Sequence, residues 1–145
     1  MRVVLQRVTH ACVVIDNRRV SCVGRGLLLL VGIHKDDTPE ATDFLAAKCA
    51  DLRVFPDEQG KMNLSLREVH GEALVVSQFT LLGDCRKGRR PSYAEAAPPE
   101  QGKELYERFV AKLRTHIRNV QTGVFGAMMQ VELVNDGPVT LVLER

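Results

Sequence analysis

The first fifteen residues alternate between apolar and polar positions. The apolar residues of one parity predict a half-buried strand, and they are Val3, Leu5, Ala11, Val13 and Ile15. The "DNRR" that follows predicts a turn, after which a second, more buried strand ends near Ile33. Arg7 falls on the apolar parity of the first strand, which is typical of a bulge or of a long side chain that reaches solvent at a sheet edge.

Two later segments carry apolar residues at helical spacing. In "DDTPEATDFLAAKCADL", Thr38 is expected as the N-cap and Pro39 as the first helical residue. The apolar stripe of this helix contains Ala41, Phe44, Leu45, Cys49 and Leu52. The second segment, "PPEQGKELYERFVAKLRTHI", has an apolar residue at every fourth position, namely Leu105, Phe109, Leu113 and Ile117.

Short apolar runs between and after these helices predict further strands. "RVF" begins one, "ALVVSQFTLL" forms another with a polar insert, and "AMMQVELV" with "VTLVLE" predicts a closing hairpin that turns at residues 135–137. Strand pairs around two helices favour an α+β fold with a mixed or largely antiparallel sheet. Because no repeat or linker divides the chain, residues 1–145 are expected to form one domain.

The composition narrows the class of protein. The chain is 45% hydrophobic and 26% charged, as in globular proteins, and its net charge of +2 is too small to indicate nucleic-acid binding by itself. Its longest apolar run, "LLLLV", is far shorter than the roughly 18 residues of a membrane span, and a cytoplasmic protein is expected. The cysteines show neither zinc-site spacing nor a disulfide framework, so we expect reduced thiols at Cys12, Cys22, Cys49 and Cys85.

The polar insert "SQFT" is the first candidate site. On a strand, Ser77 and Phe79 would share one face while Gln78 and Thr80 share the other. Buried amides and hydroxyls need hydrogen-bond partners, so these residues form an internal network or line a pocket. No base lies near Ser77 or Thr80 in the sequence, and no GxSxG elbow, paired-carboxylate motif or metal-ligand motif is present. A conventional catalytic triad is therefore not indicated.

Two further segments could contact a nucleic acid. The loop "LLGDCRKGRRPSYAEA" carries clustered cations that suit a phosphate backbone, or simply a solvated loop, at Arg86, Lys87, Arg89 and Arg90. It does not match a P-loop, because Arg89 replaces the lysine and no Ser or Thr follows. In "QTGVFGAMM", Phe125 between two glycines could offer a ring face to a base, although such a residue more often belongs to the core.

Two long motifs, "SQFTL" at 77–81 and "NDGPVT" at 135–140, are similar to those of the D-aminoacyl-tRNA deacylase family. "MRVVLQRVTHACV" and "TGVFGAMM" extend the resemblance over essentially the whole chain. The resemblance implies a compact barrel-like α+β domain that acts as a homodimer without a cofactor, with active sites at the subunit interface. It also implies that the protein hydrolyses the ester of D-aminoacyl-tRNA, and of glycyl-tRNA, with tRNA as its partner.

The resemblance assigns roles to individual residues. The catalytic strand would contain Ser77, Gln78, Phe79 and Thr80. Gly137 and Pro138 of the second chain would enter this pocket through a cis peptide bond, so that main-chain carbonyls hold the substrate's ammonium group and leave no space for an L side chain. Arg7 would orient this element, and Phe125 would lie near the terminal adenine of the tRNA.

Two other functions fit parts of the same pattern. A non-enzymatic RNA-binding module would use the basic loop and Phe125 without any chemistry. A general esterase would use Thr80 as its nucleophile, which requires a base brought close by the fold. Neither alternative explains why the two long motifs occur together.

Overall fold

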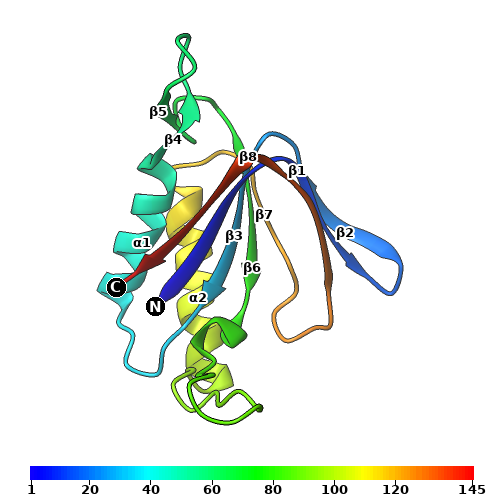
Figure 1. Ribbon diagram of the computed structural model, residues 1–145, viewed down its shortest axis with the longest axis vertical. Coiled ribbons are helices and arrows are strands. Elements are labelled where there is room, and N and C mark those ends of the chain that lie inside the picture. The colour runs from blue at the N-terminus through cyan, green and yellow to red at the C-terminus, as the bar shows by residue number, and fades with distance from the viewer.

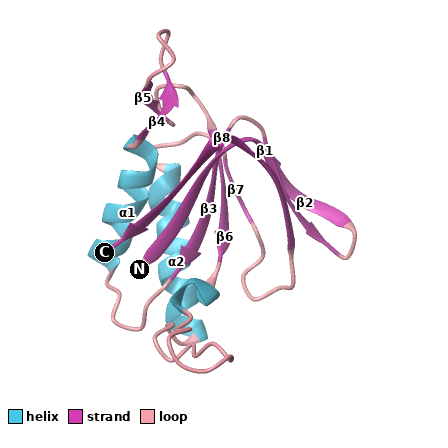
Figure 2. Ribbon diagram, viewed as in Figure 1, coloured by secondary structure: helices cyan, strands magenta, loops and turns pink.

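The computed structural model describes residues 1–145 and contains a strongly curved sheet with two helices packed on one face (Figure 1). The strands are β1 (Arg2–Ile15), β2 (Arg18–Val23), β3 (Gly26–Gly32), β4 (Arg53–Pro56), β5 (Met62–Ser65), β6 (Glu72–Ser77), β7 (Val120–Thr122) and β8 (Gln130–Glu144). The helices are α1 (Pro39–Asp51), α2 (Pro99–Arg114) and the short 3-10 helix η1 (Phe79–Leu82). Figure 2 shows α1 and α2 side by side, and the β4–β5 hairpin extending away from the sheet.

The main sheet is mixed. Its strand order is β2-β1-β3-β6-β7, with β8 also paired to β1. β3, β6 and β7 run parallel to one another, whereas the pairs of β1 with β2, β3 and β8 are antiparallel. The edge strands β2 and β7 approach each other across the curve, so the sheet is nearly closed. The predicted α+β class with a barrel-like mixed sheet is confirmed.

Apolar side chains fill both sides of this sheet. A large cluster between the sheet and the two helices includes Leu5, Leu29 and Phe109. A smaller cluster on the concave side includes Val8 and Leu28. Because neighbouring residues of a strand point to opposite faces, the continuous "LLLLV" run of β3 supplies both clusters. β3 is therefore the central strand of the fold, and both motif regions are positioned from it.

Both predicted helices are confirmed. Thr38 caps α1, and its hydroxyl accepts a hydrogen bond from the amide of Ala41 at 3.2 Å. The prediction that Phe44 belongs to the buried stripe of α1 is wrong. Its side chain is 47% exposed and lies under the guanidinium group of Arg145 instead of in the core. No helix is both long enough and apolar enough to cross a membrane.

The predicted C-terminal hairpin is wrong. Residues 130–144 form one strand, β8, which stays antiparallel to β1 along both of its halves. Between Thr140 and Asn135, β8 advances five residues while its partner β1 advances two. The chain does not reverse at 135–137 because the extra residues are accommodated as a bulge. We call residues 136–139 the β8 bulge.

The cysteine prediction is also wrong in part. Cys12 and Cys22 lie directly opposite each other on the antiparallel strands β1 and β2 and form a disulfide, with 4.1 Å between their Cα atoms. Sequence spacing does not indicate this pair, because the strand register that aligns the two thiols is a property of the folded sheet. Cys49 is buried in the core, as expected, and Cys85 is exposed. The single second strand predicted after "DNRR" is likewise divided into β2 and β3.

Candidate active site

The "SQFT" motif lies where β6 ends, and the prediction of a continuous strand there is wrong. Ser77 is the last residue of β6, paired with Val31 of the parallel strand β3. The amide of Gln78 still donates to the carbonyl of Val31 at 2.8 Å, and η1 then begins at Phe79. The side-chain amide of Gln78 donates to the hydroxyl of Thr80. The polar residues therefore occupy a turn at the sheet edge, where backbone and side-chain groups are accessible, instead of two faces of a strand.

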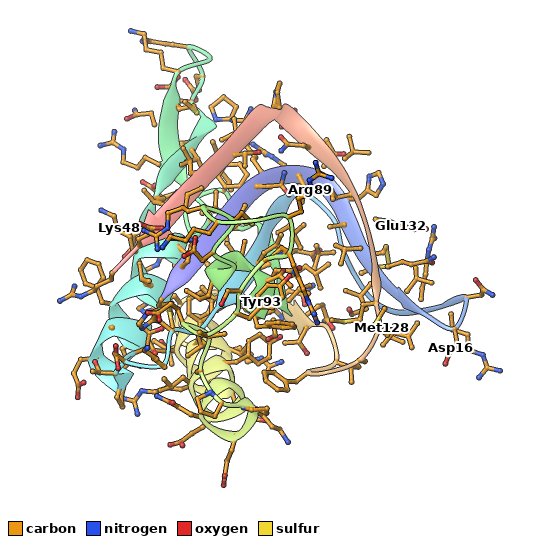
Figure 3. The ribbon with its side chains drawn as sticks, turned by 60° about the horizontal axis from the view of Figure 1, so that its bottom comes forward. Asp16, Lys48, Arg89, Tyr93, Met128 and Glu132 are labelled. Carbon is orange, nitrogen blue, oxygen red and sulfur yellow. A yellow bond between two sulfur atoms is a disulfide. The ribbon has the colours of Figure 1, made fainter.

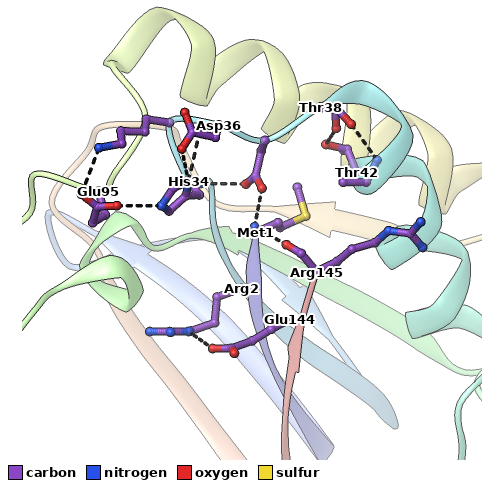
Figure 4. A network of polar contacts seen from close by, with 12 residues as sticks. Met1, Arg2, His34, Asp36, Thr38, Thr42, Glu95, Glu144 and Arg145 are labelled. Carbon is purple, nitrogen blue, oxygen red and sulfur yellow. Dashed lines mark hydrogen bonds and ion pairs between the residues drawn. The ribbon is translucent and has the colours of Figure 1, made fainter.

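The helix η1 presents its aromatic residue to solvent. The side chain of Phe79 is 56% exposed, and its ring meets the edge of Tyr93 at a centroid distance of 5.1 Å. From the other side, Arg2 donates to the carbonyl of Leu81 and pairs with Glu144 on the neighbouring strand β8 (Figure 4). η1 is thus fixed in place while the Phe79 ring is left uncovered in the single chain.

Gly32, at the end of β3, allows η1 to pack closely against the sheet. A Cβ atom at this position would lie 2.5 Å from a methyl carbon of Leu82 and 3.0 Å from the carbonyl oxygen of Gln78. A side chain here would require the Leu82 side chain to move and would press on the backbone of Gln78. Sequence reasoning missed Gly32, because a glycine that ends a strand looks like ordinary turn punctuation.

The Gly137–Pro138 element forms the centre of the β8 bulge. The peptide bond between these residues is cis, as the resemblance implies, and both residues are exposed. Gly137 has φ of +134°, a backbone conformation that residues with a side chain rarely adopt. The element projects from the sheet without a covering segment of its own chain.

Arg7 lies beside this element and is bonded to it. The residue is only 9% exposed. Its Nε donates to the carbonyl of Asp136 at 2.9 Å, and its Nη1 donates to the buried carbonyl of Val54 at 2.6 Å. Its Nε also lies 3.3 Å from a carboxylate oxygen of Asp136. Arg7 therefore joins the β8 bulge to β4. Both interpretations of Arg7 from the sequence, a bulge in β1 and a side chain that reaches solvent, are wrong.

The two motif regions do not meet within one chain. Arg7, beside Gly137, pairs with Leu27 at the start of β3, whereas Ser77 pairs with Val31 near its end. Four residues of strand separate these two positions, which is about 13 Å along β3. The structure thus brings Arg7 to Gly137 and Pro138, and groups Ser77 with Gln78, Phe79 and Thr80, but leaves the two groups apart.

Phe125 lies between β7 and β8 and is half-buried. Its ring centroid is 5.9 Å from that of Tyr106, and both rings line a cavity of about 490 Å³ with the cationic residues Lys103 and Arg114. The hydroxyl of Tyr106 donates to the carbonyl of Val75 at 2.9 Å, and burial raises the pKa of this phenol to about 12. Phe125 accordingly packs against the core with one side and borders an open cavity with the other.

The basic loop follows η1, and Figure 3 labels Arg89 and Tyr93 on it. Arg86 makes a bidentate ion pair with Asp84, with distances of 2.9 and 2.8 Å. This guanidinium group lowers the pKa of the Asp84 carboxyl to about 2. Lys87, Arg89 and Arg90 are exposed and make no ion pair. The loop thus offers three unpaired cations next to the "SQFT" motif.

No group of three or more His, Cys, Asp or Glu side chains is arranged to hold a metal ion. Glu95 instead forms an ion pair with Lys35 at 3.0 Å and contacts a ring nitrogen of His34 at 3.1 Å (Figure 4). These two contacts lower the pKa of the Glu95 carboxyl. Glu95 is therefore a charged anchor for the loop that contains it.

Comparison with protein families matches residues 4–144 to the family described as D-Tyr-tRNA(Tyr) deacylase. The chain belongs to this family. The D-aminoacyl-tRNA deacylase of Thermotoga petrophila is 58% identical over 144 residues, covering 99% of this chain and 97% of that protein. The D-aminoacyl-tRNA deacylase of Geobacter sulfurreducens is 54% identical over 144 residues, with 99% and 95% covered. The predicted resemblance is confirmed, and with it the class of enzyme, an ester hydrolase that acts on aminoacyl-tRNA.

Solved structures agree with this deacylase fold. One described as a c-Myc DNA unwinding element binding protein has a TM-score of 0.95 and 42% identity, covering 100% of this chain and 99% of that one. A probable eukaryotic D-amino acid tRNA deacylase has a TM-score of 0.84 over 98% of this chain and 97% of its own. At 21% identity, the second likeness supports the fold alone.

Proposed function

We propose that this chain removes D-amino acids, and glycine, from tRNA at a site that is completed by a second copy of itself. The observation that carries the proposal is the separation of the two motif regions along β3. Each region is exposed where a substrate would have to bind: Phe79 on one side, and Gly137 and Pro138 on the other. In the proposed dimer, each chain inserts its β8 bulge at the η1 region of its partner. Both exposed regions then belong to one site.

The surface of β8 supports a second copy as the missing partner. Val134, Leu141 and Val142 are 47, 39 and 61% exposed, and they flank the β8 bulge on both sides. Apolar side chains grouped on a long strand are typical of protein interfaces. A partner that covers this strand would also receive the projecting Gly137–Pro138 element.

Selection for the D enantiomer would depend on exclusion. Main-chain carbonyls of the Gly137–Pro138 element would accept hydrogen bonds from the substrate's ammonium group and occupy the volume that an L side chain requires. Glycine has no side chain to exclude, and its ester would therefore also be cleaved. Arg7, which fixes the carbonyl of Asp136, would maintain this arrangement without touching the substrate.

The chemistry requires little from side chains. An aminoacyl ester is already activated, so orientation, a positioned water and backbone N–H donors for the developing oxyanion account for catalysis. The amides of Phe79 and Thr80, in the first turn of η1, would supply such donors. The Thr80 hydroxyl accepts the hydrogen bond of Gln78, an arrangement that suits a structural group in the pocket more than a nucleophile paired with a base.

The decisive experiment measures hydrolysis of matched D- and L-aminoacyl-tRNA by the purified protein. We expect rapid release of the D-amino acid, release of glycine, and negligible release of the L-amino acid. Equal rates on the two enantiomers would contradict chiral selection and favour a general esterase. Binding of tRNA with no hydrolysis of either substrate would favour an RNA-binding module.

Mixing two damaged variants tests the shared site. In a mixed dimer of Gly32→Ala and Gly137→Ala subunits, one site contains both substitutions and the other contains neither. Gly32→Ala crowds the backbone of Gln78, and Gly137→Ala disturbs the β8 bulge, so each variant alone should lose rate or selectivity. We therefore expect the intact site of the mixed dimer to recover both. If each chain contains a complete site, the mixture will be no more active than the average of its two components.

A further inference from the structure

The β8 bulge has fewer partners opposite it than a regular strand. Its four residues lie between Asn135 and Thr140, and only Arg7 stands opposite them on β1. A strand that lacks ladder partners over four residues can adopt several shapes. Side-chain contacts must therefore fix the shape of this segment.

Asn135 closes the β8 bulge with both ends of its side-chain amide. Its Oδ1 accepts a hydrogen bond from the amide of Val139 at 2.8 Å, directly after Pro138. Its Nδ2 donates to the hydroxyl of Thr140, also at 2.8 Å. The same hydroxyl accepts from Gln6 of β1 at 3.2 Å. The two ends of the bulge are thereby tied together across the Gly137–Pro138 element.

Arg7 and Asn135 act on different ends of the same segment. Arg7 binds the carbonyl of Asp136, the first residue of the bulge, whereas Asn135 binds the amide of Val139, the last. The Asn135 side chain is thus bonded to both ends of this segment, and we expect its effect on the reaction to pass through the backbone that it holds.

We propose that Asn135 and Thr140 are positioning residues that set the enantiomer selectivity of the site. The inference rests on the proposed function, in which backbone atoms of the Gly137–Pro138 element exclude an L side chain. Exclusion by contact depends on where those atoms lie to within a fraction of an ångström. When the clamp is lost, the β8 bulge relaxes, the space for an L side chain opens, and selectivity falls.

The experiment compares Asn135→Ala and Thr140→Val with the wild-type protein on matched D- and L-aminoacyl-tRNA. Asn135→Ala removes both hydrogen bonds, whereas Thr140→Val removes only the hydroxyl at nearly constant volume. A hydrogen bond of this kind contributes about 1 kcal/mol, which is about fivefold in a rate. We therefore expect the ratio of D to L rates to fall about thirtyfold in Asn135→Ala, which loses both bonds of the Asn135 side chain, and about fivefold in Thr140→Val, which loses one of them. Thr140→Ser, which restores the hydroxyl, should restore the ratio.

Further measurements separate positioning from general damage. Gln101→Ala removes an exposed amide that donates to the carbonyl of Lys35 at 3.0 Å, far from both motifs in sequence, and should leave the ratio unchanged. The thermal midpoint of Thr140→Val shows whether this variant is folded. If it is folded and its ratio of D to L rates equals that of the wild-type protein, the inference is overturned. If Asn135→Ala does not fold, the comparison of D to L rate ratios between Thr140→Val and Thr140→Ser still tests the inference.

Failure of this inference is distinct from failure of the proposed function. If the wild-type protein prefers the D enantiomer and the variants keep the same preference, the role of Asn135 and Thr140 is overturned, whereas the proposed function stands. A wild-type protein with no preference overturns the proposed function, and the positioning role with it.

Discussion

The two motif regions are held in place by different kinds of contact. At the end of β6, backbone hydrogen bonds fix the chain: Gln78 donates to Val31, and Leu81 donates to the carbonyl of Gln78. In the β8 bulge, side chains do this work, with Arg7 at one end and Asn135 at the other. One region continues the buried sheet, while the other departs from it.

This difference determines how each region responds to substitution. Replacing a side chain leaves a backbone hydrogen bond in place, so most substitutions within residues 77–82 should preserve the position of η1. The β8 bulge has few ladder partners, so the loss of one side chain should move it. We therefore expect selectivity to be sensitive to Arg7 and Asn135, and the remaining chemistry to be more tolerant.

The largest effect is expected for Arg7→Ala. Removing this side chain leaves the buried carbonyl of Val54 without its partner and releases that of Asp136, which should lower the free energy of unfolding by about 2 to 3 kcal/mol and abolish enantiomer selectivity. Denaturant unfolding and D- and L-aminoacyl-tRNA hydrolysis measure the two effects. Arg53→Ala, which removes an exposed hydrogen bond to the carbonyl of Asn63, is the matched control. A stable, selective Arg7→Ala protein would contradict the comparison.

Gly32→Ala should have the next largest effect, because it crowds η1 and the backbone of Gln78 without changing a side chain of the motif. The added methyl group would meet Leu82 and the carbonyl of Gln78, and we expect a loss of about 1 to 3 kcal/mol of stability. Activity should fall while the ratio of D to L rates is retained. Gly24→Ala, where a Cβ atom meets only an ordinary contact at 3.5 Å, controls for the change of residue type. A changed ratio would show that η1 also sets selectivity.

The basic loop should affect binding without affecting selectivity. Neutral substitutions of Arg86, Lys87, Arg89 and Arg90 together should weaken tRNA binding and flatten its salt dependence, measured as the slope of affinity against salt concentration. The folded pKa of Asp84, about 2, lies below its ordinary value, so the Asp84–Arg86 pair is intact above that ordinary value and is lost only as the pH falls toward 2. At neutral pH, Arg86→Gln should therefore change the slope less than Arg89→Gln. Equal slopes for the quadruple variant and wild type would exclude this loop from the interface.

The smallest effect is expected for Thr80→Ala. If backbone donors and the activated ester account for catalysis, removing the hydroxyl should lower the rate by about threefold or less, since only the hydrogen bond from Gln78 is lost. Single-turnover hydrolysis of D-aminoacyl-tRNA measures this rate. Complete loss of hydrolysis, with substrate binding and the thermal midpoint unchanged, would give Thr80 a direct chemical role.

Local patterns in the sequence predicted much of the fold. The alternation in β1 and the spacing in α1 and α2 follow from how far apart residues on one face must lie, which is fixed within each element. Arg7 stood out on the apolar parity of β1, although its position was interpreted as a bulge or a solvent-reaching side chain and not as the buried hydrogen-bond donor that it is. The "SQFT" insert stood out as polar residues in an apolar run, but its role and that of "NDGPVT" came from the resemblance, since neither belongs to a catalytic-triad or metal-ligand motif.

Errors arose wherever a distant partner decided the outcome. Residues 130–144 form one strand because β1 is long enough to pair with both halves, although the letters "NDG" favour a reversal. Cys12 and Cys22 meet because the register of β1 and β2 aligns them. Gly32 and Asn135 gained importance only when η1 and Thr140 were placed beside them.

The sequence by itself determined the two long helices, most of the strands and their buried faces, and the family to which the chain belongs. Each of these depends on residues close together in the chain, or on long motifs kept in order. Only the tertiary structure decided which atoms Arg7 binds, the carbonyls of Asp136 and Val54, and that the two motif regions lie at opposite ends of β3. Those facts depend on strand register and on long-range pairing, which the alternation of apolar and polar residues does not encode.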